Sequence, residues 1–174
     1  MNAHAWRDAG PVPELDPGTI VRVLNKQGVR YVVIGGLAAE IHDLPVPATV
    51  DIDITPARDH TNLERLARAF DELDAGLYTA EEGGTWFPRT PVELWSQYDT
   101  LHLMTNAGPV DIVFTPDGAP SGYADLASDS VRAELEDQPV MVITVAKWEA
   151  LKKATGRAKD LEHLDLYYET RGEE

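Results

Sequence analysis

The chain has 174 residues, of which 43% are hydrophobic and 26% are charged, and these proportions are typical of one compact globular domain. It contains no cysteine, which excludes disulfides and thiolate metal sites, and no apolar run is long enough to span a bilayer. The 15 basic residues stand against 30 acidic ones, so the net charge of −15 disfavours a broad nucleic-acid surface. The acidic excess could serve solubility alone.

The first 13 residues lack the charged start and apolar centre of a secretory signal, so we expect a cytoplasmic protein. We predict an irregular arm over residues 1–15 and a single domain over residues 16–174. Asp16 and Pro17 are typical of a helix start, and Gly28 suits the end of that helix.

Hydrophobic periodicity predicts the remaining elements in chain order. They are a buried strand over 31–34, a short helix over 37–42, a strand over 50–54, a helix over 59–73, strands over 98–105 and 110–114 joined by a turn at 106–109, a strand over 140–143, and helices over 145–155 and 158–169. Residues 76–97 indicate scattered core contacts and one further strand. The pattern predicts an α/β (α+β) fold, with a small mixed β-sheet, helices mostly on one side of it, and a C-terminal helical pair.

Two carboxylates recur two residues apart in the expected strand over 50–54. Side chains two apart in a strand project from the same face, so Asp51 and Asp53 should point together while Ile52 and Ile54 enter the core. Two like charges side by side repel unless a cation or a shared proton lies between them. A hard divalent ion such as Mg²⁺ suits this pair, and an ordinary polar strand face is the alternative.

Two further features accompany the carboxylate pair. Gly35 and Gly36 follow a buried strand directly, where backbone N–H groups can hold phosphate oxygens, although a tight turn that binds nothing has the same sequence. Asp111 interrupts the apolar strand over 110–114 and supplies a third carboxylate. The combination favours a site for a metal ion and a nucleotide.

The helix over 145–155 carries a lysine on its apolar side. Lys152 projects near Trp148 and Leu151, so it must either extend its ammonium to solvent or meet a negative partner such as a phosphate. Asp160 lies in the first turn of the last helix, where the helix dipole favours a carboxylate in any case. His102 is expected to be a packed or hydrogen-bonded histidine rather than a ligand.

The run over 32–38, with its Gly35-Gly36 pair, and the run from Thr49 to Asp53 resemble the signature of the DNA polymerase β-like nucleotidyltransferase superfamily. The strand around Asp111 resembles the one that bears the third carboxylate of that signature. Residues 150–161 resemble the helices of small bacterial nucleotidyltransferases, among them toxins of abortive-infection-type toxin–antitoxin systems. The resemblance covers residues 18–165.

This resemblance implies a nucleotidyltransferase core and a role for each matching residue. Asp51, Asp53 and Asp111 would hold Mg²⁺, with two ions expected and Mn²⁺ as a substitute. The nucleotide triphosphate would be held by Gly35, Gly36, Thr49 and Lys152. Asp160 would be an orienting group or a base near the active site. The chain departs from the family pattern at Leu37, where a serine is common, and at Pro47, where many relatives have an arginine.

The expected activity is transfer of a nucleoside monophosphate from a nucleoside triphosphate to an acceptor, with a tRNA 3′ end and a toxin role as the first interpretation. Five basic residues near the C-terminus favour RNA, namely Lys147, Lys152, Lys153, Arg157 and Lys159. An antitoxin-like enzyme that places AMP on a partner protein is the alternative, because an acidic surface suits a basic protein. A cognate toxin or antitoxin would then be the partner. A non-catalytic nucleotide-binding domain is the third interpretation, motivated by Leu37 and Pro47.

Overall fold

The computed structural model describes residues 12–78, 86–88, 95 and 97–172. The described helices are α2 (Pro17–Lys26), α3 (Gly35–Ile41), α4 (His60–Glu72), α6 (Tyr123–Ser128), α7 (Val145–Thr155) and α8 (Ala158–Gly172). The strands are β1 (Tyr31–Ile34), β2 (Ile52–Pro56), β3 (Gly76–Tyr78), β4 (Trp86–Pro88), β5 (Thr100–Thr105), β6 (Gly108–Val113), β7 (Ser130–Leu135) and β8 (Gln138–Ile143).

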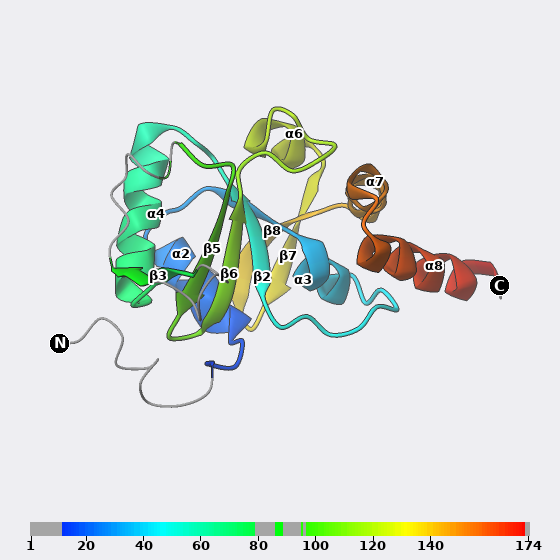
Figure 1. Cartoon of the computed structure of the whole chain (residues 1–174), viewed down its shortest axis with the longest axis horizontal. Coiled ribbons are helices and arrows are strands. Elements are labelled where there is room, and N and C mark those ends of the chain that lie inside the picture. The colour runs from blue at the N-terminus through cyan, green and yellow to red at the C-terminus, as the bar shows by residue number, and fades with distance from the viewer. Residues whose placement is uncertain (1–11, 79–85, 89–94, 96, 173–174) are drawn as a thin grey trace.

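The strands form one 8-stranded mixed sheet in the order β4-β3-β5-β6-β2-β1-β8-β7. The pairs β1–β8 and β2–β6 are parallel, and the other neighbours are antiparallel. The mixed α/β fold with a C-terminal helical pair is therefore confirmed. Figure 1 shows α2 and α4 on one side of the strands and α3, α7 and α8 on the other, so the prediction of helices mostly on one side is wrong.

The two-sided arrangement follows from the side chains of the central strands. Ile52 and Ile54 of β2 are fully buried. On β1 every residue is buried, which requires cover on both faces. The second cover comes from α3 and α6, which both contact β1 and β2.

A capping residue marks the start of α2, as the sequence predicts. The Asp16 carboxylate accepts a hydrogen bond from the Thr19 amide at the start of α2, with Pro17 as the first helical residue. Before α2, residues 12–15 have no regular secondary structure, and the rest of the predicted arm lies outside the described residues. Two strands, β3 and β4, lie within 76–97, where one strand was predicted. The sequence analysis missed α6 and β7 and started the helix after β1 two residues late, since α3 begins at Gly35 itself.

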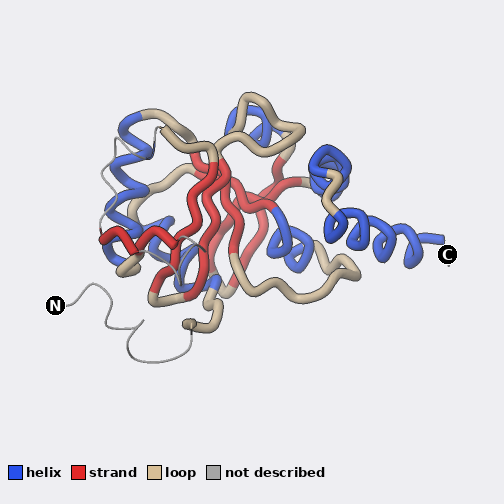
Figure 2. The backbone as a smooth tube through the Cα atoms, in the orientation of Figure 1, coloured by secondary structure: helices blue, strands red, loops and turns tan. Residues whose placement is uncertain are grey.

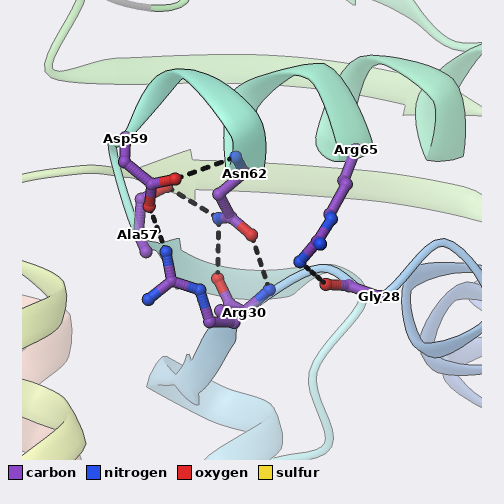
Figure 3. A network of polar contacts seen from close by, with 6 residues as sticks. All are labelled: Gly28, Arg30, Ala57, Asp59, Asn62 and Arg65. Atoms are coloured by element: carbon purple, nitrogen blue, oxygen red, sulfur yellow. Dashed lines mark hydrogen bonds and ion pairs between the residues drawn. The ribbon is translucent and has the colours of Figure 1, made fainter.

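A buried asparagine ties α4 to the strands that carry the candidate site. Asn62 is fully buried and accepts a hydrogen bond from the Arg30 amide at 2.8 Å. Its own amide group donates to the carbonyls of Arg30 at 3.0 Å and Ala57 at 2.7 Å (Figure 3). Arg30 also forms an ion pair with Asp59, the cap of α4. Because Arg30 precedes β1 and Ala57 follows β2, this network fixes how the two strands lie beside each other.

Within the described residues, every helix is too short or too polar to cross a membrane.

Candidate functional site

A row of polar side chains crosses three neighbouring strands. Asp53 on β2 pairs in register with Asp111 on β6, and Asp111 pairs with His102 on β5. Neighbouring strands lie about 4.8 Å apart, and directly paired residues share one face of the sheet. On the other side of Asp53 the register partner is Ile34, the last residue of β1 before Gly35. The sheet therefore brings the predicted Asp53 and Asp111 together and sets them next to the glycine pair.

The predicted strand over 50–54 includes Asp51, but β2 begins at Ile52, so Asp51 lies just before the strand. The Thr49 hydroxyl donates to the Asp51 carboxylate at 2.9 Å and lies 3.1 Å from the Asp51 carbonyl oxygen. These contacts hold Asp51 in a bend at the end of the loop that joins α3 to β2 (Figure 2). Asp51 still lies close enough for its charge to act on both Asp53 and Asp111.

Gly35 is in close contact with Asp53, and this contact explains why the position takes glycine. Its φ of +67° is in the left-handed region, and a Cβ added there would stand 2.9 Å from Asp53 Cγ and closer still to Oδ2. At Gly36 an added Cβ would stand 2.8 Å from the Thr49 side chain. The two glycines thus let the backbone approach both the carboxylate and Thr49.

The Asp53 carboxyl group has a strongly perturbed acidity. Burial, followed by the negative charges of Asp51 and Asp111, raises the pKa of Asp53 to about 7, although Lys152 and Arg157 act in the opposite direction. Among the described residues no donor forms a hydrogen bond with the Asp53 carboxylate. A cation placed beside Asp53 would relieve the repulsion that raises its pKa.

His102 holds Asp111 from the solvent side. Its Nδ1 atom lies 2.7 Å from Asp111 Oδ1, and the histidine side chain is 59% exposed. Burial raises the pKa of Asp111, whereas the hydrogen bond and charge of His102 lower it. The expectation of a hydrogen-bonded histidine is confirmed, but the sequence analysis did not foresee that its partner is a site residue.

The C-terminal helices present a buried ion pair. Lys152 Nζ lies 2.6 Å from Asp160 Oδ1, and both residues are buried. Asp160 also accepts hydrogen bonds from Thr155 at 2.6 Å and Arg157 at 2.8 Å, and His163 Nδ1 lies 3.3 Å from Lys152 Nζ. Burial alone would raise the pKa of Asp160, but the hydrogen bonds from its three donors outweigh it and lower the pKa to about 2.

Lys152 was expected either to extend its ammonium to solvent or to meet a negative partner such as a phosphate. In the structure it meets a negative partner, which is the Asp160 carboxylate. The pair is nevertheless close enough to the carboxylate row for the positive charges of Lys152 and Arg157 to lower the pKa of Asp53. The sequence analysis did not include Arg157 among the site residues. The positive charge of its guanidinium also lowers the pKa of Asp111, and its side chain is 76% exposed.

Three carboxylates are the candidate ligands for a divalent ion. Asp51, Asp53 and Asp111 offer hard carboxylate oxygens, which suit Mg²⁺ and Mn²⁺. Within the described part of the chain, no three histidine, aspartate or glutamate side chains converge closely enough to enclose an ion, since the Asp51 and Asp111 carboxylates turn to Thr49 and His102. The chemistry of the donors fits a metal ion, and the roles of these residues as ligands remain a prediction.

The fold of this chain is similar to those of known proteins. No family model matches the chain, and no curated protein matches it. Among solved structures, TM1012 of Thermotoga maritima, proposed to be a nucleotidyltransferase, has a TM-score of 0.53 at 18% identity over 91% of this chain and 97% of its own. The antibiotic-resistance factor ANT(2'')-Ia has a TM-score of 0.52 at 13% identity over 88% of this chain and 80% of its own. The chain has a nucleotidyltransferase fold. At these identities the likeness concerns the fold, and the activity has to be argued from the site.

Proposed function

We propose that this protein is a metal-dependent nucleotidyltransferase, which moves a nucleoside monophosphate from a nucleoside triphosphate to an acceptor hydroxyl and releases pyrophosphate. The observation that carries the proposal is the in-register pair of Asp53 and Asp111 on parallel strands, with the Gly35 backbone against Asp53. The nucleotidyltransferase fold of the chain agrees with this assignment.

Each site residue is assigned a role in the proposal. Asp51, Asp53 and Asp111 would hold two Mg²⁺ ions, or Mn²⁺ in their place. The metal ions supply charge neutralisation on the phosphates and on the departing pyrophosphate. Gly35, Gly36 and Thr49 would hold the triphosphate next to the carboxylates. Lys152 and Asp160 remain candidates for phosphate contact and for orientation of the acceptor.

Lys152 and Asp160 act on the site as a neutralised pair. Lys152 places a positive charge near Asp53, while Asp160 fixes the position of that charge through a 2.6 Å contact. A lysine held in this way is pre-positioned for an anionic substrate, since its side chain has already lost its rotational freedom. Arg157 shares the same anchor through Asp160 and leaves most of its guanidinium exposed.

The charge of the C-terminal segment bears on whether the acceptor is an RNA or a protein. The expectation of a tRNA 3′ end, modified by a toxin, rested on the basic segment near the C-terminus. In the structure Lys147 pairs with Asp129, Lys153 with Glu149, and both Lys152 and Arg157 with Asp160. These pairs reduce the positive charge that is free to hold RNA phosphates, and they leave the exposed Arg157 guanidinium and Lys159, which forms no ion pair among the described residues.

The distribution of charge therefore favours the second acceptor, a hydroxyl on a partner protein. With a net charge of −15, the chain suits a basic partner, such as the cognate member of a toxin–antitoxin pair. The protein would then act as an AMP-transferring modifier. We propose the cytoplasm as its location, where nucleoside triphosphates and both acceptor classes are present.

The test combines the four labelled triphosphates, Mg²⁺, total RNA and total protein with the purified chain. The double variant Asp51→Ala/Asp53→Ala is expected to lose incorporation, while Asp71→Ala/Asp165→Ala, which removes two exposed helical aspartates, should retain it. Label on RNA identifies the first acceptor, and label on protein identifies the second. Incorporation by the Asp51/Asp53 variant at the parental rate would contradict the proposal. Tight nucleotide binding without pyrophosphate release from any triphosphate would instead indicate the non-catalytic domain.

A further inference from the structure

The strand β7 ends the sheet, and among the described elements only β8 pairs with it. Apolar side chains are exposed on this hairpin. Val131 on β7 is 41% exposed, and Met141 on β8 is 39% exposed. A terminal strand with open backbone groups and exposed apolar side chains is a template for another strand.

The turn between β7 and β8 determines which backbone groups face outward. Glu136 and Asp137 have φ angles of 47° and 63°, as in a two-residue type I′ hairpin turn. Leu135 and Gln138 flank the turn and form a hydrogen-bonded pair, and such pairs alternate along an antiparallel ladder. Ala133 therefore points its N–H and C=O groups toward β8, whereas Arg132 and Glu134 point theirs toward the open edge.

We propose that a second copy of this chain pairs with β7 through its own β7, antiparallel and around a two-fold axis at Ala133. In a two-fold interface the same strand must complement itself. An axis at Ala133 places Arg132 of one copy opposite Glu134 of the other, twice, and both residues present outward backbone groups. An axis at Arg132 or Glu134 would put like charges opposite each other, which destabilises an antiparallel pair.

The side chains on both faces of the strand agree with this register. Arg132 and Glu134 are exposed, and among the described residues neither takes part in an ion pair, so both charges are available to the second copy. On the other face, Val131 would lie opposite Leu135, which already packs against the core. Pairing would thus cover Val131 and join the two sheets into one continuous sheet. The net charge of −15 on each copy opposes association, but the Debye length of about 8 Å at 0.15 M salt limits that repulsion.

The test is sedimentation velocity of the full chain over a wide range of concentration at physiological salt. The parent protein should dimerise. Arg132→Glu and Glu134→Arg should each raise the dissociation constant by about tenfold or more, because each places two like-charge pairs across the interface. The double variant Arg132→Glu/Glu134→Arg restores opposite charges in both pairs and should restore the dimer.

The control is Arg68→Glu, which makes the same change of charge on an exposed residue of α4. Amide exchange provides a second measurement, in which the amides of Arg132 and Glu134 should become protected as the concentration rises. A parent protein that stays monomeric at the highest concentration would overturn the proposal. A double variant as weak as the single variants, or equal weakening by Arg68→Glu, would also overturn it.

Discussion

Replacement of Gly35 by alanine tests the contact between the glycine turn and the carboxylate row. Alanine at a φ of +67° costs about 1–2 kcal/mol in backbone strain. Its Cβ would also stand 2.9 Å from Asp53 Cγ, so the carboxylate would have to move by about 1 Å to reach an ordinary separation. A displacement of that size in a reacting site costs on the order of 100-fold in rate.

Gly28 offers a matched control for the same substitution. Its φ is +69°, almost identical to that of Gly35, but an added Cβ would meet only the flexible Arg65 side chain, at 3.9 Å. Gly28→Ala should therefore carry the backbone cost and leave the carboxylates in place. Comparison of the two variants separates strain in the turn from displacement of Asp53.

Two measurements are needed, the free energy of unfolding from urea titration and the rate of nucleotide incorporation. Gly28→Ala should lose about 1–2 kcal/mol of stability and keep its rate. Gly35→Ala should lose at least as much stability and also lose incorporation by about 100-fold. Equal rates for the two variants would refute the reasoning, because Asp53 would then tolerate the added methyl group.

Three further predictions concern the ionisable groups. The pKa of Asp53 is raised to about 7 in the folded chain, so its carboxyl group stabilises the fold below the unfolded pKa of 3.8 and loses that contribution as the pH rises through 7. In urea unfolding without divalent metal, Asp53→Asn should therefore be about 2–4 kcal/mol more stable than the parent protein at pH 8 and equally stable near pH 4. The same variant should lose nucleotide incorporation. Asp160→Asn leaves Lys152 buried without a full charge partner and should lower the free energy of unfolding by about 3 kcal/mol or more. The control Lys153→Ala removes an exposed ion pair and should lower it by less than about 0.5 kcal/mol. Similar losses in both variants would argue against the buried pair. His102→Ala removes the hydrogen-bond partner of the Asp111 carboxylate and should slow nucleotide incorporation by about tenfold. His102→Asn keeps a hydrogen-bond donor and should retain more activity. An unchanged rate in His102→Ala would show that Asp111 needs no such partner.

The local order of the elements was readable from the sequence because it depends on nearby residues. The Asp16-Pro17 start of α2 and the apolar period of α4 concern contacts within one or two turns of a helix. Asp53 and Asp111 were also identifiable from nearby residues, because each is a polar residue within an otherwise apolar strand. The strand β7 was missed, although polar and apolar residues alternate from Ser130 to Leu135, as in a strand with one buried face.

The neighbours of His102 depended on one turn that periodicity does not determine. The sequence analysis placed four residues in the turn at 106–109, but β5 and β6 close on Thr105 and Gly108. This tighter turn puts His102, instead of Met104, opposite Asp111. A two-residue turn at Asn106 and Ala107 was the signal that would have revealed the pair.

The sequence by itself determined the residue types of the site, because a carboxylate in an apolar strand and a glycine pair after a buried strand are visible in one dimension. The tertiary structure decided which of them meet. Parallel pairing of β2 with β6 aligns Asp53 with Asp111, and packing of α7 against α8 gives Lys152 to Asp160. Asp53 and Asp111 lie far apart in the chain, and Lys152 and Asp160, although only eight residues apart, belong to different helices. Both contacts follow from strand order and helix packing, which local patterns do not encode.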